Sequence, residues 1–277
     1  MEAKEKPVPR AAVIHDLCSV GKAAMTNILP VLSVLGIEAC PVPTMVLSTH
    51  TGGFGRPVME ELTDFPGQCA FHLKENGVEF SHIFVGYLGT LEMVERVGEF
   101  LSLYPRAEVL LDPIMADHGS YYMNFDDAYG QAMGRLLGRA HLITPNYTEA
   151  CLLAGLDWKD VCTKEQLLFG CQRLEALGAE QTVITSVPLP QAEMSLAVYE
   201  KGRLQILERQ AAGRAYPGTG DLFAAVLLGR RILGDGLFAA AEKAHEFVCR
   251  CIRTGDAWGY PVRQGVLLEP NLRYLWK

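Results

Sequence analysis

Short apolar runs alternate with helical patterns along the first two-thirds of the chain. Such alternation is typical of a parallel sheet that is covered by helices on both faces. The predicted strands are residues 11–15, 37–46, 82–86, 109–112, 141–144 and 182–186. We therefore expect an α/β fold, a three-layer sandwich whose central sheet is mostly parallel.

The last third of the chain changes this pattern. Residues 194–209 predict a β-hairpin that turns at Lys201 and Gly202 and adds antiparallel strands to one edge of the sheet. Two further apolar runs, 221–233 and 237–252, predict helices that close the fold. No internal repeat, low-complexity segment or linker interrupts the chain, so we expect one domain that spans residues 1–277.

Three local signals refine the helices and loops. Thr163 and Gln166 have the spacing of a capping box before a helix over 167–177. Pro30 lies in the first helical pattern, where its ring should kink or break the helix. Glycine and polar residues cluster in 48–57 and 117–127, which makes these loops the best candidates for mobile lids.

Charge and composition narrow the range of partners. The chain has 277 residues, a net charge of −7 and a pI near 5.5, and it lacks the clustered Lys and Arg that nucleic-acid phosphates require. No run of about 18 apolar residues could span a membrane, and the charged start of the chain lacks the apolar core of a signal peptide. We expect a cytoplasmic protein that binds neither nucleic acid nor membranes.

The cysteines predict no metal or redox site. Zinc sites and thiol redox sites are usually recognised by a C-x-x-C pair, and none is present. Buried free thiols are the better explanation. The eight cysteines are Cys18, Cys40, Cys69, Cys151, Cys162, Cys171, Cys249 and Cys251.

The most informative motif is Gly218-Thr219-Gly220-Asp221, which lies directly before the apolar run 222–233. The glycine turn should therefore open a helix. A helix start offers unpaired backbone N–H groups and partial positive charge to a phosphate. An acid at Asp221 could accept a proton from a hydroxyl that attacks this phosphate. A glycine loop in which Asp221 only favours the helix dipole would explain the same residues.

Polar side chains follow three of the predicted strands. In open α/β sheets, ligands bind beyond the carboxyl ends of the strands. Carboxylates, hydroxyls and an amide would therefore meet at one edge, a mixture that suits magnesium and phosphate. These residues are Asp112, Asp117, Thr144, Asn146, Glu149, Thr185 and Ser186.

Each of these residues also has an ordinary structural explanation. Asn146 and Glu149 have the spacing of a capping box, and Asp112 before Pro113 is typical of a turn. Taken alone, His50 and His118 are typical of structural or surface histidines. The functional interpretation is favoured because all of the polar strand ends are expected at one edge of the sheet.

Taken together, the motifs resemble the ribokinase-like superfamily, and specifically its pyridoxal kinase branch. The resemblance covers nearly the whole chain in the family's order. Its motifs are G-T-G-D at 218–221, D-P-I-M at 112–115, T-P-N-Y-T-E at 144–149, V-L-G-I-E at 34–38, S-T-H-T-G at 48–52, G-Y-L-G at 86–89 and V-I-T-S at 183–186. It implies a ribokinase-like fold and ATP-dependent phosphorylation of the 5′-hydroxyl of pyridoxal, pyridoxine or pyridoxamine. It also implies a homodimer that uses Mg²⁺ and a monovalent cation, K⁺ or Na⁺.

The resemblance further implies roles for individual residues. Asp221 would be the catalytic base, and the backbone from Gly218 to Gly220 would form the anion hole. The implied ATP contacts are Asp112, Asp117, Tyr122, Thr144, Asn146, Thr185, Ser186 and Thr219. The implied metal-site residues are Glu149, Asp112 and Asn146. The implied substrate contacts are Asp16, Thr44, His50 and Asp221.

One position departs from the family's pattern. Many members carry a serine followed by a histidine after the first strand, where this chain has Asp16 and Leu17. We hypothesise that Asp16 accepts a hydrogen bond from a protonated pyridine nitrogen of the substrate. The alternative is that Asp16 caps the following turn.

Three other functions fit parts of the sequence. A sister kinase with the same motif could phosphorylate a hydroxymethylpyrimidine or a sugar. A binding protein could hold a vitamer or a nucleotide without turnover, although it would be expected to lack an acid such as Asp221. A dinucleotide fingerprint is disfavoured because the residues before Gly218 are polar and the motif lies late in the chain.

Overall fold

Six strands form the parallel part of one central sheet. Their hydrogen-bonded pairs are all parallel. They are β1 (Arg10–Val20), β2 (Glu38–Thr49), β4 (His82–Val85), β5 (Glu108–Leu111), β8 (Leu142–Ile143) and β9 (Gln181–Leu189). This computed structural model describes residues 8–190, 192–209 and 212–276, and it confirms the predicted sheet.

Antiparallel strands extend both edges of this sheet. The predicted hairpin is present as β10 (Ala192–Glu200) and β11 (Arg203–Leu207), and it turns at Lys201 and Gly202, whose φ angles are 52° and 74°. The sequence did not predict β3 (Met59–Glu61), which pairs with β2 at the other edge. The order of the sheet is β11-β10-β9-β8-β5-β4-β1-β2-β3.

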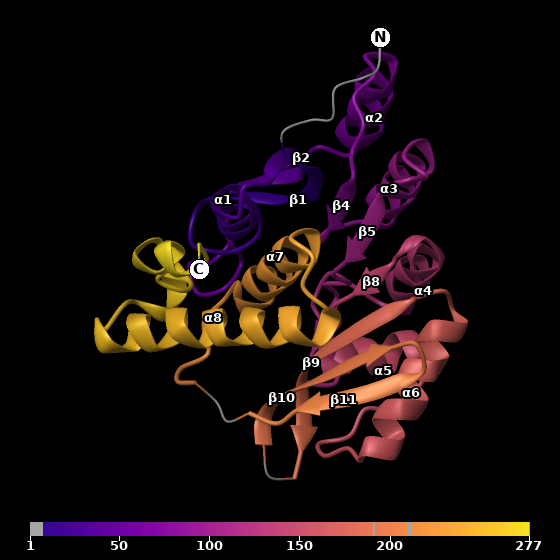
Figure 1. Cartoon of the computed structure of the whole chain (residues 1–277). Coiled ribbons are helices and arrows are strands. Elements are labelled where there is room, and N and C mark those ends of the chain that lie inside the picture. Colours follow the sequence, from indigo (N-terminus) through magenta and orange to yellow (C-terminus); the bar gives the residue numbers. More distant parts are fainter. Residues whose placement is uncertain (1–7, 191, 210–211, 277) are drawn as a thin grey trace.

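Helices cover both faces of the sheet, as expected for a three-layer sandwich (Figure 1). One layer contains α1 (Met25–Val34), α7 (Thr219–Ile232) and α8 (Leu237–Ala257). The other contains α2 (Phe65–Glu75), α3 (Leu91–Leu103), α4 (Asp127–Leu136), α5 (Tyr147–Ala154) and α6 (Lys164–Ala176). Short 3₁₀ turns lie at Leu137–Arg139, Val262–Gln264 and Glu269–Tyr274. Among the described residues, no helix combines the length and apolar character that a bilayer crossing requires.

Two of the local predictions had different outcomes. The capping box of Thr163 and Gln166 is present at the start of α6. Pro30 was expected to kink or break the first helix; the helix is not broken, because α1 continues through this residue, and a kink stays a prediction. Ile28, Val31 and Leu32 are fully buried in the core that α1 shares with α7, and this packing offsets the hydrogen bond that proline removes.

The two predicted loops are more regular than expected. Residues 48 and 49 complete β2, and the second loop contains a small hairpin of β6 (Ala116–Asp117) and β7 (Ser120–Tyr121). His118 and Gly119 form the tip of this hairpin with φ angles of 50° and 78°. The mobility of both segments stays a prediction.

Candidate active site

A cavity of about 350 Å³ lies where β5, β8 and β9 approach the start of α7. Twelve of the fifteen predicted site residues line it, whereas Asp16, Thr44 and His50 lie outside its walls. The twelve are Asp112, Asp117, Tyr122, Thr144, Asn146, Glu149, Thr185, Ser186, Gly218, Thr219, Gly220 and Asp221. The fold therefore brings together residues that are more than one hundred positions apart in the sequence.

The two glycines of the G-T-G-D turn meet different requirements. Gly218 has a φ of +76°, and a Cβ atom there would lie 2.1 Å from the carbonyl oxygen of Lys22. Only glycine fits this backbone and this contact. A Cβ atom on Gly220 would meet nothing within 4 Å, so the space beside it is open. Gly218 shapes the turn, and Gly220 leaves room for a ligand.

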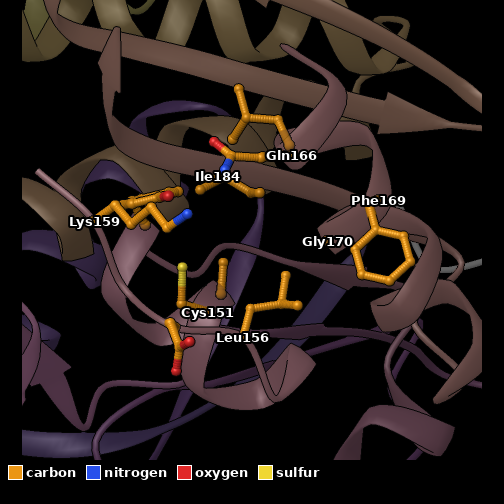
Figure 2. A pocket seen from close by; sticks show the side chains of 11 residues that line it. Cys151, Leu156, Lys159, Gln166, Phe169, Gly170 and Ile184 are labelled. Carbon is orange, nitrogen blue, oxygen red and sulfur yellow. The ribbon is translucent and has the colours of Figure 1, made fainter. Parts of the chain in front are cut away.

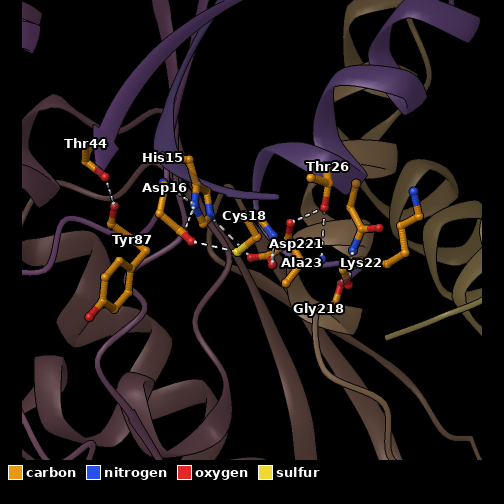
Figure 3. Close-up of polar contacts among 12 residues, drawn as sticks. His15, Asp16, Cys18, Lys22, Ala23, Thr26, Thr44, Tyr87, Gly218 and Asp221 are labelled. Atoms are coloured by element: carbon orange, nitrogen blue, oxygen red, sulfur yellow. Dashed lines mark hydrogen bonds and ion pairs between the residues drawn. The ribbon is translucent and has the colours of Figure 1, made fainter. Parts of the chain in front are cut away.

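Asp221 lies in the first turn of α7 and is 8% exposed. Its Oδ2 accepts a hydrogen bond from the backbone N–H of Ala24 at 2.5 Å, and its Oδ1 lies 3.3 Å from Nε2 of His15 (Figure 3). Ala24 has a φ of 54°, a conformation that costs a non-glycine residue about 1–3 kcal/mol. The loop before α1 is therefore held in a strained conformation that directs an N–H group at this carboxylate.

His15 connects Asp221 with Asp16, and the sequence analysis missed it. Its Nδ1 lies 2.7 Å from Oδ1 of Asp16, while the thiol of Cys18 lies 3.4 Å from Oδ2 of Asp16. Neighbouring residues of a strand normally face opposite sides, but the register of β1 shifts between His15 and Leu17, so His15 and Asp16 are both buried. The adjacent His and Asp at the end of an apolar run were the available signal.

The charges of this cluster stabilise one another. Burial alone would lower the pKa of His15, but hydrogen bonds and the charges of Asp16 and Asp221 raise it to about 10. Burial alone would raise the pKa of Asp221, but His15 and the Ala24 N–H lower it. His15 and Asp221 therefore favour each other's charged forms.

Asn146 and Glu149 form a complete capping box at the start of α5, so their structural explanation is confirmed. Oε2 of Glu149 accepts from the N–H of Asn146 at 2.9 Å, and Oε1 accepts from the N–H of Met115 at 3.0 Å. The side-chain amide of Asn146 donates to the carbonyl of Ala116 at 2.7 Å. Both side chains thus join α5 to the segment that follows β5.

Asp112 and Glu149 are neighbouring buried carboxylates in the cavity, and they could help to hold a divalent cation that enters together with a nucleotide. Burial and the charge of Asp221 raise the pKa of Asp112 to about 7. Burial and Asp112 raise the pKa of Glu149, although backbone N–H groups oppose this shift. Within the described part of the chain, no group of three or more His, Cys, Asp or Glu side chains could hold a metal by itself. Mg²⁺ usually keeps waters and phosphate oxygens as ligands, so one or two carboxylates suffice.

The side chains of Thr44 and His50 form hydrogen bonds with backbone groups of the protein. Thr44 is fully buried and donates its hydroxyl to the carbonyl of Tyr87 at 3.0 Å (Figure 3). Nε2 of His50 lies 2.8 Å from the carbonyl of Arg263, and its Nδ1 accepts from the N–H of Gly52 at 3.0 Å. Both ring nitrogens of His50 therefore hold loops together, as a structural histidine would. Contact of either residue with substrate stays a prediction.

Apolar side chains complete the cavity, and the sequence analysis did not single them out. An apolar wall with a few polar groups suits a flat heteroaromatic ring. Each of these residues belongs to an ordinary core pattern of its own strand, loop or helix, so no local signal marks it. They are Leu196, Tyr216, Phe223 and Val248, together with His245.

A separate cavity of about 280 Å³ lies between α5 and α6 (Figure 2). Its walls include Cys151, Leu156, Phe169 and Ile184, with Asp157 and Lys159 as charged groups. None of the predicted site residues lines it. It has one carboxylate and lacks the G-T-G-D turn at a helix start, so the candidate active site is the cavity at the start of α7.

This geometry agrees with comparisons to known proteins. The family model described as phosphomethylpyrimidine kinase matches residues 29–265, which is most of the chain. The chain belongs to the phosphomethylpyrimidine kinase family. It is 30% identical to the pyridoxine/pyridoxal/pyridoxamine kinase of Bordetella avium, over 82% of this chain and 80% of that relative.

Solved structures of this family have the same fold. A candidate phosphomethylpyrimidine kinase from Bacteroides thetaiotaomicron, crystallised with pyridoxal, is 34% identical and has a TM-score of 0.90 over 97% of this chain and 96% of that one. Pyridoxal kinase from Lactobacillus plantarum is 29% identical, with a TM-score of 0.90 over 96% of both chains. The ribokinase-like fold implied by the sequence motifs is therefore confirmed.

Proposed function

We propose that the protein is an ATP-dependent kinase that phosphorylates the 5′-hydroxyl of pyridoxal, pyridoxine or pyridoxamine. The observation that carries the proposal is the buried carboxylate of Asp221, held at the start of α7 beside the open space at Gly220. Relatives named as kinases of the three B6 vitamers, and a 34% identical structure containing pyridoxal, support the substrate class.

The glycine turn and Asp221 have different roles in the proposed reaction. The backbone N–H groups of the 218–220 turn, at the positive end of α7, would hold the transferring phosphoryl group. The substrate oxygen attacks the γ-phosphorus, the bond to the ADP oxygen breaks, and the hydroxyl proton passes to Asp221. An ionised Asp221 is a weak base, but a loose transition state needs little early deprotonation.

The remaining polar residues would bind the nucleotide and its cation. We assign Mg²⁺ to the carboxylate of Asp112, with Asn146 and Glu149 fixing the surrounding backbone. Mg²⁺ would neutralise charge on the β- and γ-phosphates. The ATP contacts would come from Asp117, Tyr122, Thr144, Thr185, Ser186 and Thr219. We further propose that the enzyme uses a monovalent cation, K⁺ or Na⁺, and forms a homodimer. The eight free cysteines are compatible with the reducing cytoplasm, which is the location we propose.

The geometry at Asp16 is compatible with a contact to the substrate ring. Its Oδ1 lies next to Nδ1 of His15, whereas its Oδ2 accepts, among the described residues, only from the thiol of Cys18, a weak donor. Oδ2 can therefore accept from a protonated pyridine nitrogen. Changing Asp16 to Ser should raise the KM of at least one vitamer and leave the KM of ATP unchanged. Unchanged KM values for all three vitamers would remove this contact.

The decisive experiment measures ADP release with Mg·ATP and K⁺. The candidate acceptors are pyridoxal, pyridoxine, pyridoxamine, hydroxymethylpyrimidine and ribose. Turnover that depends on a pyridine vitamer supports the proposal. Activity confined to hydroxymethylpyrimidine would agree with the proposed fold and base but would select the second candidate, a hydroxymethylpyrimidine kinase. Tight vitamer binding without ADP release would instead indicate a binding protein.

A further inference from the structure

The buried side chain of His15 has no part in the proposed phosphoryl transfer. His15 is 1% exposed, lies in β1 and is neither in the nucleotide cavity nor in contact with solvent. Its two ring nitrogens point in opposite directions, toward carboxylates that come from different elements (Figure 3). A fully buried polar ring of this kind requires an explanation, because an unpartnered one would be costly.

The surrounding backbone is built to hold this ring in place. A Cβ atom on Gly86 would lie 2.1 Å from Cδ2 of His15, so the ring occupies the space that glycine leaves. The edge of the ring packs against Phe84, with ring centroids 6.1 Å apart and an angle of 89° between their planes. The register shift in β1 turns His15 and Asp16 toward the same buried region. Position and orientation are therefore both fixed.

The charged groups around His15 are mostly acidic. Asp16 and the thiol of Cys18 lie on its own strand, and Asp221 approaches from α7. Asp112, after β5, is acidic and also interacts with His15 electrostatically, while His50, after β2, acts on Asp221. An uncharged residue in place of His15 would remove the partner that lowers the pKa of Asp221, so Asp221 would take up a proton more readily.

We propose that His15 is a positioning residue: its ring ties the base Asp221 to Asp16, so that recognition of the substrate ring and orientation of the base are coupled. This inference rests on the proposed function for the identity of the substrate. It adds that a ring contact at Asp16 is transmitted through a single side chain to the carboxylate that receives the proton. Asp221 is thereby held from both sides, by His15 at Oδ1 and by the Ala24 N–H at Oδ2.

The first test compares His15→Gln with His82→Gln in the full-length protein. His82 begins β4 at the amino end of the sheet, away from the cavity, and provides a matched control. His15→Gln should lower kcat by roughly tenfold to a hundredfold and raise the vitamer KM, while the KM of ATP changes less than about twofold. The acidic limb of the kcat/KM profile should move to higher pH, because Asp221 loses the cation that lowers its pKa. His82→Gln should behave as wild type.

A lower melting temperature with an unchanged kcat and an unchanged acidic limb would overturn the proposal and leave His15 a structural role alone. A double-mutant cycle provides a further test. If Asp16 and His15 act through one network, the combined effect of Asp16→Asn and His15→Gln on kcat should be smaller than the sum of the two single effects in free energy. Strict additivity would contradict the coupling.

A second measurement needs no variant to fold. In the ¹⁵N spectrum of the wild-type protein, pyridoxine should shift the signals of the His15 ring nitrogens, because both lie next to the proposed ring contact and the base. Signals that do not respond to pyridoxine, although pyridoxine is turned over, would refute the proposal. Failure of the proposed function is distinguishable, because then no vitamer supports ADP release. If another hydroxyl compound is phosphorylated instead, the kinetic test of His15→Gln would use that compound as the substrate.

Discussion

Asp221 and Glu149 are both buried carboxylates in the first turn of a helix, yet their surroundings differ. Glu149 receives its hydrogen bonds from backbone N–H groups, which cannot titrate. One carboxylate oxygen of Asp221 accepts a hydrogen bond from a backbone N–H, and the other lies next to the ring of His15. The first carboxylate joins two segments, whereas the second has a partner whose charge and position can influence its chemistry.

The comparison shows that an acid at a helix start does not by itself indicate catalysis. Both residues satisfy the dipole of their helix. What distinguishes them is the open space beside the glycine turn and the ionisable partner behind Asp221.

Changing Asp221 to Ala should lower kcat by roughly a hundredfold or more, because the proton acceptor is lost, with little effect on ATP affinity. Steady-state kinetics and nucleotide titration provide the measurement. Asp127, an exposed acid in the first turn of α4, offers the control, and Asp127→Ala should retain wild-type kcat. Retained turnover in the Asp221 variant would show that the base has been assigned wrongly.

The two glycines of the turn should separate stability from activity. Gly218→Ala should lower the free energy of unfolding by about 1–3 kcal/mol or more, because of its positive φ and the contact with Lys22. Gly220→Ala should leave the free energy of unfolding nearly unchanged and reduce kcat, since the methyl group enters the space assigned to the phosphoryl group. Denaturant titration and ADP release on both variants measure this contrast. Equal loss of stability would contradict the assignment of the open space.

Glu149→Gln should lower the free energy of unfolding by about 1–3 kcal/mol, because the new amide donor would face backbone N–H groups that need an acceptor. The matched variant is Gln166→Ala in the exposed capping box of α6, which should cost less and leave the kinetics intact. An unchanged stability in Glu149→Gln would mean that the capping box is not what Glu149 contributes.

The stabilising effect of His15 should depend on pH. Its folded pKa of about 10 is higher than its ordinary value of 6.5, so its contribution is fully present below about pH 6.5 and disappears as the pH rises to about 10. Urea titrations of wild type and His15→Gln should show a difference in free energy of unfolding that shrinks over this interval. A difference that stays constant would mean that His15 is neutral in the folded protein.

Much of the fold could be predicted because its signals are local. The apolar runs at β4 and β5 are bounded by polar residues, and the Lys201-Gly202 turn has the chemistry of a two-residue hairpin. The missed strands β3, β6 and β7 have two or three residues and little apolar character, so their pairing depends on tertiary contacts. Pro30 misled the prediction of α1 for a similar reason, since packing against α7 is not visible in the sequence.

The candidate site residues that directly follow a strand or begin a helix could be predicted from the sequence. His15 could not, because its orientation depends on the local register of β1. Asp112, Thr144 and Asp221 stand at element boundaries, and the cavity includes all three. His15 was missed because the alternation of a strand gives no sign of a register shift. The structure also showed that Asn146 and Glu149 form a capping box while lining the cavity, so the two explanations offered by the sequence are not exclusive.

The contacts around Asp221 also bear on how the protein matures during synthesis. Ala24 and Asp221 are separated by 197 residues, and His50 and Arg263 by 213. Contacts of such long range form late and slow folding, because the intervening chain must first be ordered. A ribosome that has released only the first two hundred residues would carry much of the sheet without Asp221. The contact between Ala24 and Asp221 can therefore form only after the start of α7 has been synthesised.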